Sequence, residues 1–124
     1  MEDIKNMNII KICEFVDNGL SEKNGLKIRE KILETLTKNN EVILDFSNIT
    51  LFATPFFNSF IGYFVLQINP ENTKEKIKII NISDLGRDTY NHSYENAVYI
   101  RNKKLKEKEK KEIGKITSNN INEG

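Results

Sequence analysis

Hydroxyl, amide and carboxylate side chains flank the junction between an apolar run, residues 42–44, and an aromatic segment that ends at Phe64. The apolar run favours a strand that is covered on both faces. Thr54 followed by Pro55 is typical of a helix start, because the Thr hydroxyl can accept from a first-turn amide and proline loses no hydrogen bond there. The pattern predicts a strand-to-helix turn, residues 47–59, as the candidate binding surface.

Each polar group at this turn has a structural and a functional interpretation. Asp45 is expected to organise the turn by accepting from backbone amides, and Pro55 to fix the helix start. Thr54 is either an N-cap or a phosphoacceptor, since a phosphate there meets free amides and the positive end of the helix dipole. The candidates for contacting a partner or accepting a phosphate are Thr54, Ser47, Asn58, Ser59, Phe52 and Phe56.

Aromatic residues concentrate in the same stretch, because six of the seven phenylalanines lie between residues 46 and 64. Most of them are expected to form the core. One of Phe52 and Phe56 is expected at the surface, where aromatic side chains often anchor a partner.

No group of residues typical of catalysis, cofactor binding or metal binding stands out. The only histidine, His92, is not part of a specific zinc-ligand pattern, and Cys13 is the only cysteine. No nucleophile has a base close to it in a recognisable arrangement, and no Gly-rich phosphate loop is present. We therefore expect a protein that is not an enzyme and has no cofactor or metal.

Length and charge exclude several further classes. A chain of 124 residues fits one domain plus a tail. The net charge is +1, but residues 101–124 hold eight Lys/Arg and four Asp/Glu, whereas residues 1–100 hold eleven and fourteen. No basic face for nucleic acid, no apolar run for a membrane and no signal peptide is expected, so the cytoplasm is the expected location.

Alternating and helical hydrophobic patterns predict three strands and three helices in turn. The strands are expected at residues 7–16, 41–47 and 76–82, and the helices at 25–37, 54–68 and from 83 or 84 to about 100. This order predicts an α/β layer arrangement, in which the crossover connections require neighbouring strands to be parallel. The domain is expected to span residues 1–101, and residues 102–124 to form a charged, mobile tail.

The motifs resemble two related groups of proteins. Residues 45–49, Asp-Phe-Ser-Asn-Ile, followed by Thr54 at a helix start, resemble the STAS domain of anti-sigma factor antagonists. The phosphoacceptor position of that family falls on Thr54. Two neighbouring positions depart from the family's pattern, since Ala53 stands where the family has an acidic residue and Phe56 where it has a glycine. The similarity to STAS-like bacterial domains of unknown function is closer and spans residues 7–100. It rests on residues 25–29, 45–47, 53–58, Gly62, 82–87 and 95–97.

The resemblance implies a STAS-like α/β fold, with a mixed sheet of about four strands and helices packed on its faces. It also implies a non-enzymatic regulatory protein–protein interaction module, controlled by phosphorylation at the start of the second helix. The implied partner is another protein, such as a kinase or a kinase-like ATPase regulator. Two alternatives remain open. The same edge could sense a small ligand or nucleotide, or the protein could be a structural homo-oligomer in a bacterial defence or toxin–antitoxin pair.

Overall fold

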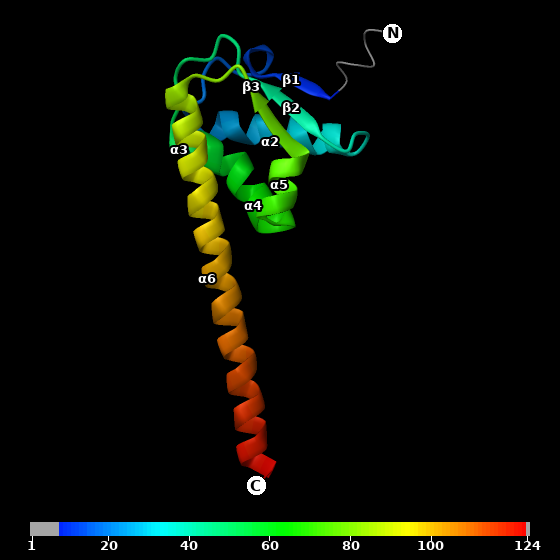
Figure 1. Ribbon diagram of the computed structural model, residues 1–124, viewed down its shortest axis with the longest axis vertical. Helices are drawn as coiled ribbons and strands as arrows, with labels where there is room; N and C mark the ends of the chain where they lie inside the picture. The colour runs from blue at the N-terminus through cyan, green and yellow to red at the C-terminus, as the bar shows by residue number, and fades with distance from the viewer. Residues whose placement is uncertain (1–7, 124) are drawn as a thin grey trace.

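A small parallel sheet and a layer of helices make up the body of the protein (Figure 1). The computed structural model describes the backbone of residues 8–123 and the side chains of residues 8–114. The strands are β1 (Ile9–Lys11), β2 (Val42–Asp45) and β3 (Ile77–Ile80), in the order β1-β2-β3. Both pairings are parallel, with Ile9 opposite Ile43 and Val42 opposite Ile77. The prediction of a mixed sheet of about four strands was therefore wrong, since three parallel strands are present among the described residues.

The nearest approach to a fourth strand is an isolated parallel bridge between Gly19 and Phe52. Two backbone hydrogen bonds of 2.8 Å join these segments, from Gly19 N–H to the Leu51 carbonyl and from Ala53 N–H to the Gly19 carbonyl. The pairing goes no further because Asn18 and Ser21 turn the chain on either side, by accepting from the backbone amides of Leu20 and Asn24.

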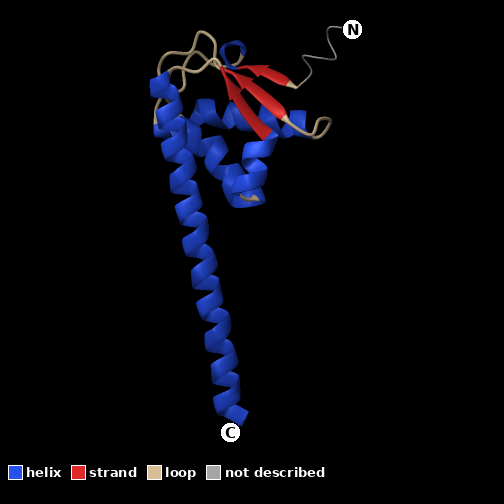
Figure 2. Ribbon diagram, viewed as in Figure 1, coloured by secondary structure: helices blue, strands red, loops and turns tan. Residues whose placement is uncertain are grey.

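One face of the sheet carries the core and the other is largely open. Residues facing the helices are buried, including Ile10, Leu44 and Ile77. Their neighbours on the opposite face are exposed, including Lys11 and Lys78. Figure 2 shows the longer helices on one side of the strands. The described helices therefore cover one face of the sheet, and the expectation of helices on both faces was wrong.

The first helix begins earlier than its hydrophobic pattern suggested. α2 spans Glu22–Leu36, and the Ser21 hydroxyl caps it by accepting from Asn24 N–H at 3.0 Å. Before it, β1 is shorter than the predicted strand, because the chain turns into the 3₁₀ segment η1 (Ile12–Glu14). That turn buries Ile12 completely. Residue 7 of the predicted strand lies outside the described residues.

The aromatic segment forms three consecutive helical pieces: α3 (Thr54–Phe57), the π-helical turn η2 (Asn58–Gly62) and α4 (Tyr63–Ile68). Ala53, with an extended backbone, occupies the N-cap position, and Thr54 is the first helical residue, with no side-chain cap bond at this end. The N-cap interpretation of Thr54 was therefore wrong by one position. The predicted helix end at residue 68 is confirmed, but Pro70 then opens a further helix, α5 (Pro70–Lys76). Asn69 caps that helix by accepting from Asn72 N–H at 2.8 Å.

Phenylalanine rings fill the space between sheet and helices. Phe57 packs against four other phenylalanines and Tyr90, with ring centroids 5.2–6.0 Å apart. Such tilted, edge-to-face and stacked pairs add to the stabilisation from apolar burial. The rings come from the segment that follows β2, from α3, from η2 and from α6, so this cluster fixes the helices against the end of the central strand.

The last helix, α6, spans Asp84–Glu123, a length of about 60 Å at the usual rise per residue. The Ser83 hydroxyl accepts from Gly86 N–H at its start. Arg101 donates to the carbonyls of Val65 and Leu66 at 3.2 and 2.9 Å and so fastens α6 to the end of α4. The predicted end near residue 100 was too early.

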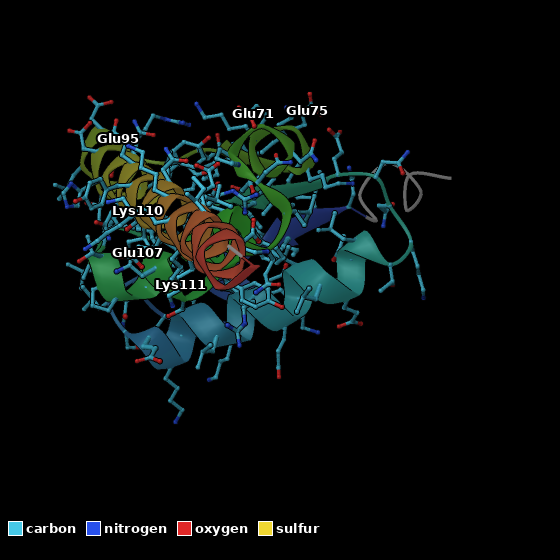
Figure 3. All side chains as sticks on the ribbon, turned by 90° about the horizontal axis from the view of Figure 1, so that it is seen from below. Glu71, Glu75, Glu95, Glu107, Lys110 and Lys111 are labelled. Atoms are coloured by element: carbon cyan, nitrogen blue, oxygen red, sulfur yellow. The ribbon has the colours of Figure 1, made fainter. Side chains whose placement is uncertain are left out.

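Beyond Arg101, α6 projects away from the body, and the side chains of residues 102–114 are exposed (Figure 1). Figure 3 looks along this helix and shows Glu107, Lys110 and Lys111 pointing outward from its axis. The predicted boundary at residue 101 thus falls inside a continuous helix, and the mobility of residues 102–124 stays a prediction. Among the described residues, no helix is both long enough and apolar enough to cross a membrane.

Candidate functional site

Asp45 and Ser47 form a compact polar cluster at the carboxyl end of β2. The Asp45 Oδ1 atom accepts from the Ser47 amide at 2.9 Å and from the Ser47 hydroxyl at 2.6 Å. It also accepts from Asn81 Nδ2 at 3.1 Å, just past the end of β3. Asn81 and Asn48 have φ of 57° and 68°, in the left-handed region that Asn tolerates better than most residues. The carboxylate thus holds the turns after two neighbouring strands together.

These contacts also determine the acidity of Asp45. Burial alone would raise its pKa, but the hydrogen bonds from Ser47 and Asn81 outweigh that effect. The positive charge of Lys11 acts in the same direction, so the pKa of the Asp45 carboxyl lies below its usual value. The ionised form is therefore the one that organises this end of the sheet.

The other predicted residues of the turn differ in their access to solvent. Phe56 is completely buried, so it belongs to the core and cannot serve as an exposed anchor in this conformation. Phe52 is half-buried and stacks on Phe57, with ring centroids 5.8 Å apart. Thr54 is also half-buried. The structure therefore leaves the edges of Phe52 and Thr54, but not Phe56, within reach of a partner.

Pro55, Asn58 and Ser59 line a groove of about 540 Å³ between α2, the α3–η2–α4 segment and α6. We call it the helical groove. Its polar lining is Glu22, Arg29, Asn58, Ser59, Tyr63 and Asn96, and its apolar lining is Leu26, Pro55, Leu66, Ala97 and Ile100, with Gly62 between them. The predicted residues Pro55, Asn58 and Ser59 are thus brought together here, away from Asp45 and Ser47.

Two features give the helical groove a defined shape. Gly25 lets α2 approach α3 and η2 closely, because a Cβ at that position would lie 2.3 Å from the Phe56 carbonyl oxygen in α3 and 2.6 Å from Ser59 Cβ in η2. Ser59 is nearly buried and its hydroxyl donates to the Pro55 carbonyl at 2.7 Å. Asn58, one residue earlier, stays exposed. The π-helical turn therefore turns an amide side chain toward solvent at the wall of the groove, and such turns occur frequently at functional sites.

Arg29 supplies a positive charge on the α2 side of the helical groove. Its guanidinium carbon lies 4.4 Å from the centroid of the Tyr63 ring, which is a favourable cation–π distance. No carboxylate forms a salt bridge with Arg29 within the described part of the chain. Stacking therefore orders the guanidinium while leaving its hydrogen-bond donors available to a ligand.

The sequence did not single out Glu22, Arg29, Tyr63 and Asn96 as site residues. Glu22 and Arg29 are seven residues apart, which places them two turns apart on one face of α2. This spacing could have identified them as neighbours on one surface. Nothing in the sequence placed Asn96 of α6 opposite them, because that contact depends on how two distant helices pack.

The groups available here suit binding by hydrogen bonds, charge and apolar contact. His92 is exposed on α6 and does not line the helical groove, and Cys13 is half-buried elsewhere. Within residues 8–114, no three His, Cys, Asp or Glu side chains gather as a metal site would require.

Comparisons with known proteins give one match. The family model for the STAS-like domain of unknown function (DUF4325) matches residues 24–87, from α2 to the first turn of α6. Neither curated proteins nor solved structures gave a match. The matched range covers more than half of the chain and contains the strand-end cluster and most of the helical groove. The chain therefore belongs to the family of STAS-like domains of unknown function, with an α/β fold built on a parallel sheet.

Proposed function

We propose that this domain is a non-enzymatic regulatory module that binds another protein through the helical groove and the adjoining strand-to-helix turn. The observation that carries the proposal is the groove itself, with a π-helical turn on one wall and a stacked arginine on the other. A partner side chain entering it would meet amide, hydroxyl and guanidinium donors around an apolar floor. This is the mixture found where protein interfaces have an apolar centre and a polar rim.

The position of the groove supports an interaction role over a catalytic one. Its ionisable lining consists of Glu22, Arg29 and Tyr63, with no histidine, cysteine or second carboxylate to form an acid–base pair. Instead, Arg is a residue type enriched at interface hot spots, as is Tyr. The groove is formed by packed helices, so its shape is set by helix packing before a partner arrives.

The test is quantitative co-purification from the native host, with mass spectrometry of the tagged protein and whatever accompanies it. Arg29→Ala and Asn58→Ala should each reduce a stoichiometric partner at least about fivefold, as expected for loss of roughly 1 kcal/mol. The matched controls are Lys27→Ala on α2 and Gln67→Ala on α4, which are exposed and line no groove. Equal recovery from groove variants and controls would contradict this assignment of the surface.

Phosphorylation of Thr54, which the resemblance implies, is a separate part of the proposal. Thr54 begins α3 and is partly accessible, so a phosphate there would face the free amides of the first turn. Tandem mass spectrometry of the protein from its host tests this directly. Loss of partner binding in Thr54→Asp but not in Thr54→Ser would indicate that charge at this position controls the interaction. Normal binding by Thr54→Asp would contradict control by phosphorylation.

One observation favours a second function, a small-ligand sensor. The helical groove has a volume of about 540 Å³, which lies within the usual range for ligand pockets. A ligand that binds only the folded form raises the melting temperature by mass action. Screening nucleotides and metabolites by thermal shift, with Arg29→Ala as the control, distinguishes this function from protein binding.

A further inference from the structure

The outer edge of β3 presents backbone groups that the sheet does not use. No strand lies beside this edge among the described residues. In a parallel pair, alternate residues bond to the neighbouring strand and those between them face outward. Phe46 N–H donates to the Ile80 carbonyl at 3.0 Å, so Ile80 and Lys78 bond toward β2. The amide and carbonyl of Ile79 therefore point away from the sheet.

The outward carbonyl of Ile79 is only weakly engaged. Its contact is the guanidinium of Arg87, at 3.4 Å, from the first turn of α6. This distance is at the long end for a hydrogen bond, so exchanging it for a backbone amide at about 2.9 Å would improve the geometry. Arg87 thus covers an edge position that a strand could occupy.

A groove of about 640 Å³ runs along this edge between β3, α5 and α6, and we call it the edge groove. Its walls combine apolar and aromatic side chains with charged ones. The lining is Ile77, Ile79, Tyr90, Tyr94, Asn91, Lys74, Lys78, Arg87 and Glu95. Three cations against one carboxylate give the lining a net charge of +2. Lys74 is also held in place, because its ammonium nitrogen lies 4.7 Å from the Tyr94 ring centroid.

The opposite edge of the sheet differs in charge. The groove beside β1 has a similar volume, about 510 Å³, but its lining includes Lys11 and Lys31 together with Glu14, Glu34 and Asp45. Carboxylates therefore outnumber cations there. The two edges are not equivalent, and β3 is the one whose charge complements an acidic chain.

We propose that the β3 edge and the edge groove bind an extended acidic segment of a partner protein, which adds as a strand beside β3. The segment's backbone pairs with the amide and carbonyl of Ile79, in the manner of other strand additions. Its carboxylates meet Lys74, Lys78 and Arg87. At about 3.3 Å per residue, four to six residues of the segment suffice to cover the four residues of β3.

Arg87 changes its partner when the segment binds. It leaves the Ile79 carbonyl and pairs with a carboxylate of the incoming strand, and charge-assisted hydrogen bonds of this kind are stronger than neutral ones. Without the segment, Arg87 and the edge residue Lys78 discourage non-specific pairing, as charged side chains do on natural sheet edges. The edge groove is separate from the helical groove, so either proposal can fail without the other.

The experiment uses the full-length protein labelled with ¹⁵N and an N-acetylated peptide of alternating Val and Glu, (Val-Glu)₃-amide. Three matched peptides accompany it: (Val-Lys)₃-amide, and two acidic peptides N-methylated at alternate residues, one for each hydrogen-bonding edge. We expect the acidic peptide to shift the Ile79 amide resonance and slow its hydrogen exchange. The lysine peptide, and the acidic peptide methylated on its pairing edge, should each bind at least about tenfold more weakly than the unmethylated acidic peptide.

Variants locate the contact on the protein. Lys78→Glu should weaken binding of the acidic peptide about tenfold, whereas Lys104→Glu, an identical charge change on the exposed part of α6, should alter it less than about twofold. The proposal is overturned if acidic and lysine peptides bind alike, or if the Ile79 resonance does not move at about 2 mM peptide. It is also overturned if light scattering shows a dimer in which the Ile79 amide is already protected, because a second copy of the chain then occupies the edge.

Discussion

Two glycines in neighbouring helices should respond to alanine with opposite signs. At Gly25 a new Cβ would lie 2.3 Å from the Phe56 carbonyl oxygen and 2.6 Å from Ser59 Cβ. Because real Cβ contacts are essentially never under 3.0 Å, α2 must move away from the Phe56 carbonyl of α3 by at least the difference, about 0.7 Å. Overpacking of this kind costs up to about 3 kcal/mol, and the better helix propensity of alanine returns about 1 kcal/mol. We expect Gly25→Ala to lower the free energy of unfolding by about 2 kcal/mol.

Gly62 provides the matched control, because a Cβ there meets nothing within 4 Å and the backbone is helical. Gly62→Ala should raise the free energy of unfolding by about 0.5–1 kcal/mol. Urea denaturation followed by circular dichroism measures both variants, and unchanged m-values would show that the unfolding transition is comparable. A Gly25→Ala protein as stable as the parent, or equal losses in both variants, would refute the close approach of α2 and η2. Since the new methyl of Gly62→Ala enters the helical groove, the same protein should bind a groove partner less tightly.

Three further predictions concern the strand-end cluster and α6. Asp45→Asn should cost about 1 kcal/mol at neutral pH in urea denaturation, since a charged acceptor for Ser47 is lost. Because the pKa of Asp45 is lowered in the folded state, the carboxylate stabilises the fold above its unfolded pKa of about 3.9, and this contribution is lost as pH falls through the folded pKa. The parent and Asp45→Asn should therefore converge in free energy of unfolding below about pH 4. Parallel plots of that free energy against pH for the two proteins would contradict this. Arg101→Ala should lower the free energy of unfolding by about 1–2 kcal/mol, because two carbonyls at the end of α4 lose their donor. Arg101→Lys should be intermediate, and thermal melts of both variants provide the comparison. A chain ending after Asn102 should unfold within about 0.5 kcal/mol of the parent, because residues 102–114 are exposed; a larger loss would show that the projecting helix supports the body.

The sequence predicted the elements whose hydrophobic pattern matches their burial. Ile28 and Ile32 of α2 are completely buried, as helical spacing indicated, and the run at Val42 and Leu44 forms the central strand. Patterns of this kind are informative because burial follows the period of the element. The order of strands and helices, and the resemblance to STAS-like domains, followed from the same stretch of sequence.

Local geometry was harder to predict, because tertiary contacts override local preference. The Thr-Pro pair indicated the helix start correctly, but Ala53 occupies the N-cap position. The Ala53 N–H donates to the Gly19 carbonyl, and this contact with a distant segment fixes where the helix begins. The π-helical turn at Asn58 has no sequence signal, since it depends on the packing of α2 against η2 through Gly25. The part of the helical groove contributed by the α3–η2 segment was therefore predictable, whereas the parts contributed by α2 and α6 were not.

The two grooves share α6 as a wall, and this has a consequence for partner choice. Asn96 and Ile100 line the helical groove, while Tyr90 and Tyr94 line the edge groove. All four lie on α6 beyond residue 87, where the matched range ends, whereas most of the opposite walls, on α2, η2, β3 and α5, lie inside it. Residues of this one helix therefore contribute to both grooves. Replacing the exposed groove-facing residues of α6 should therefore change which partner is bound while the domain stays folded.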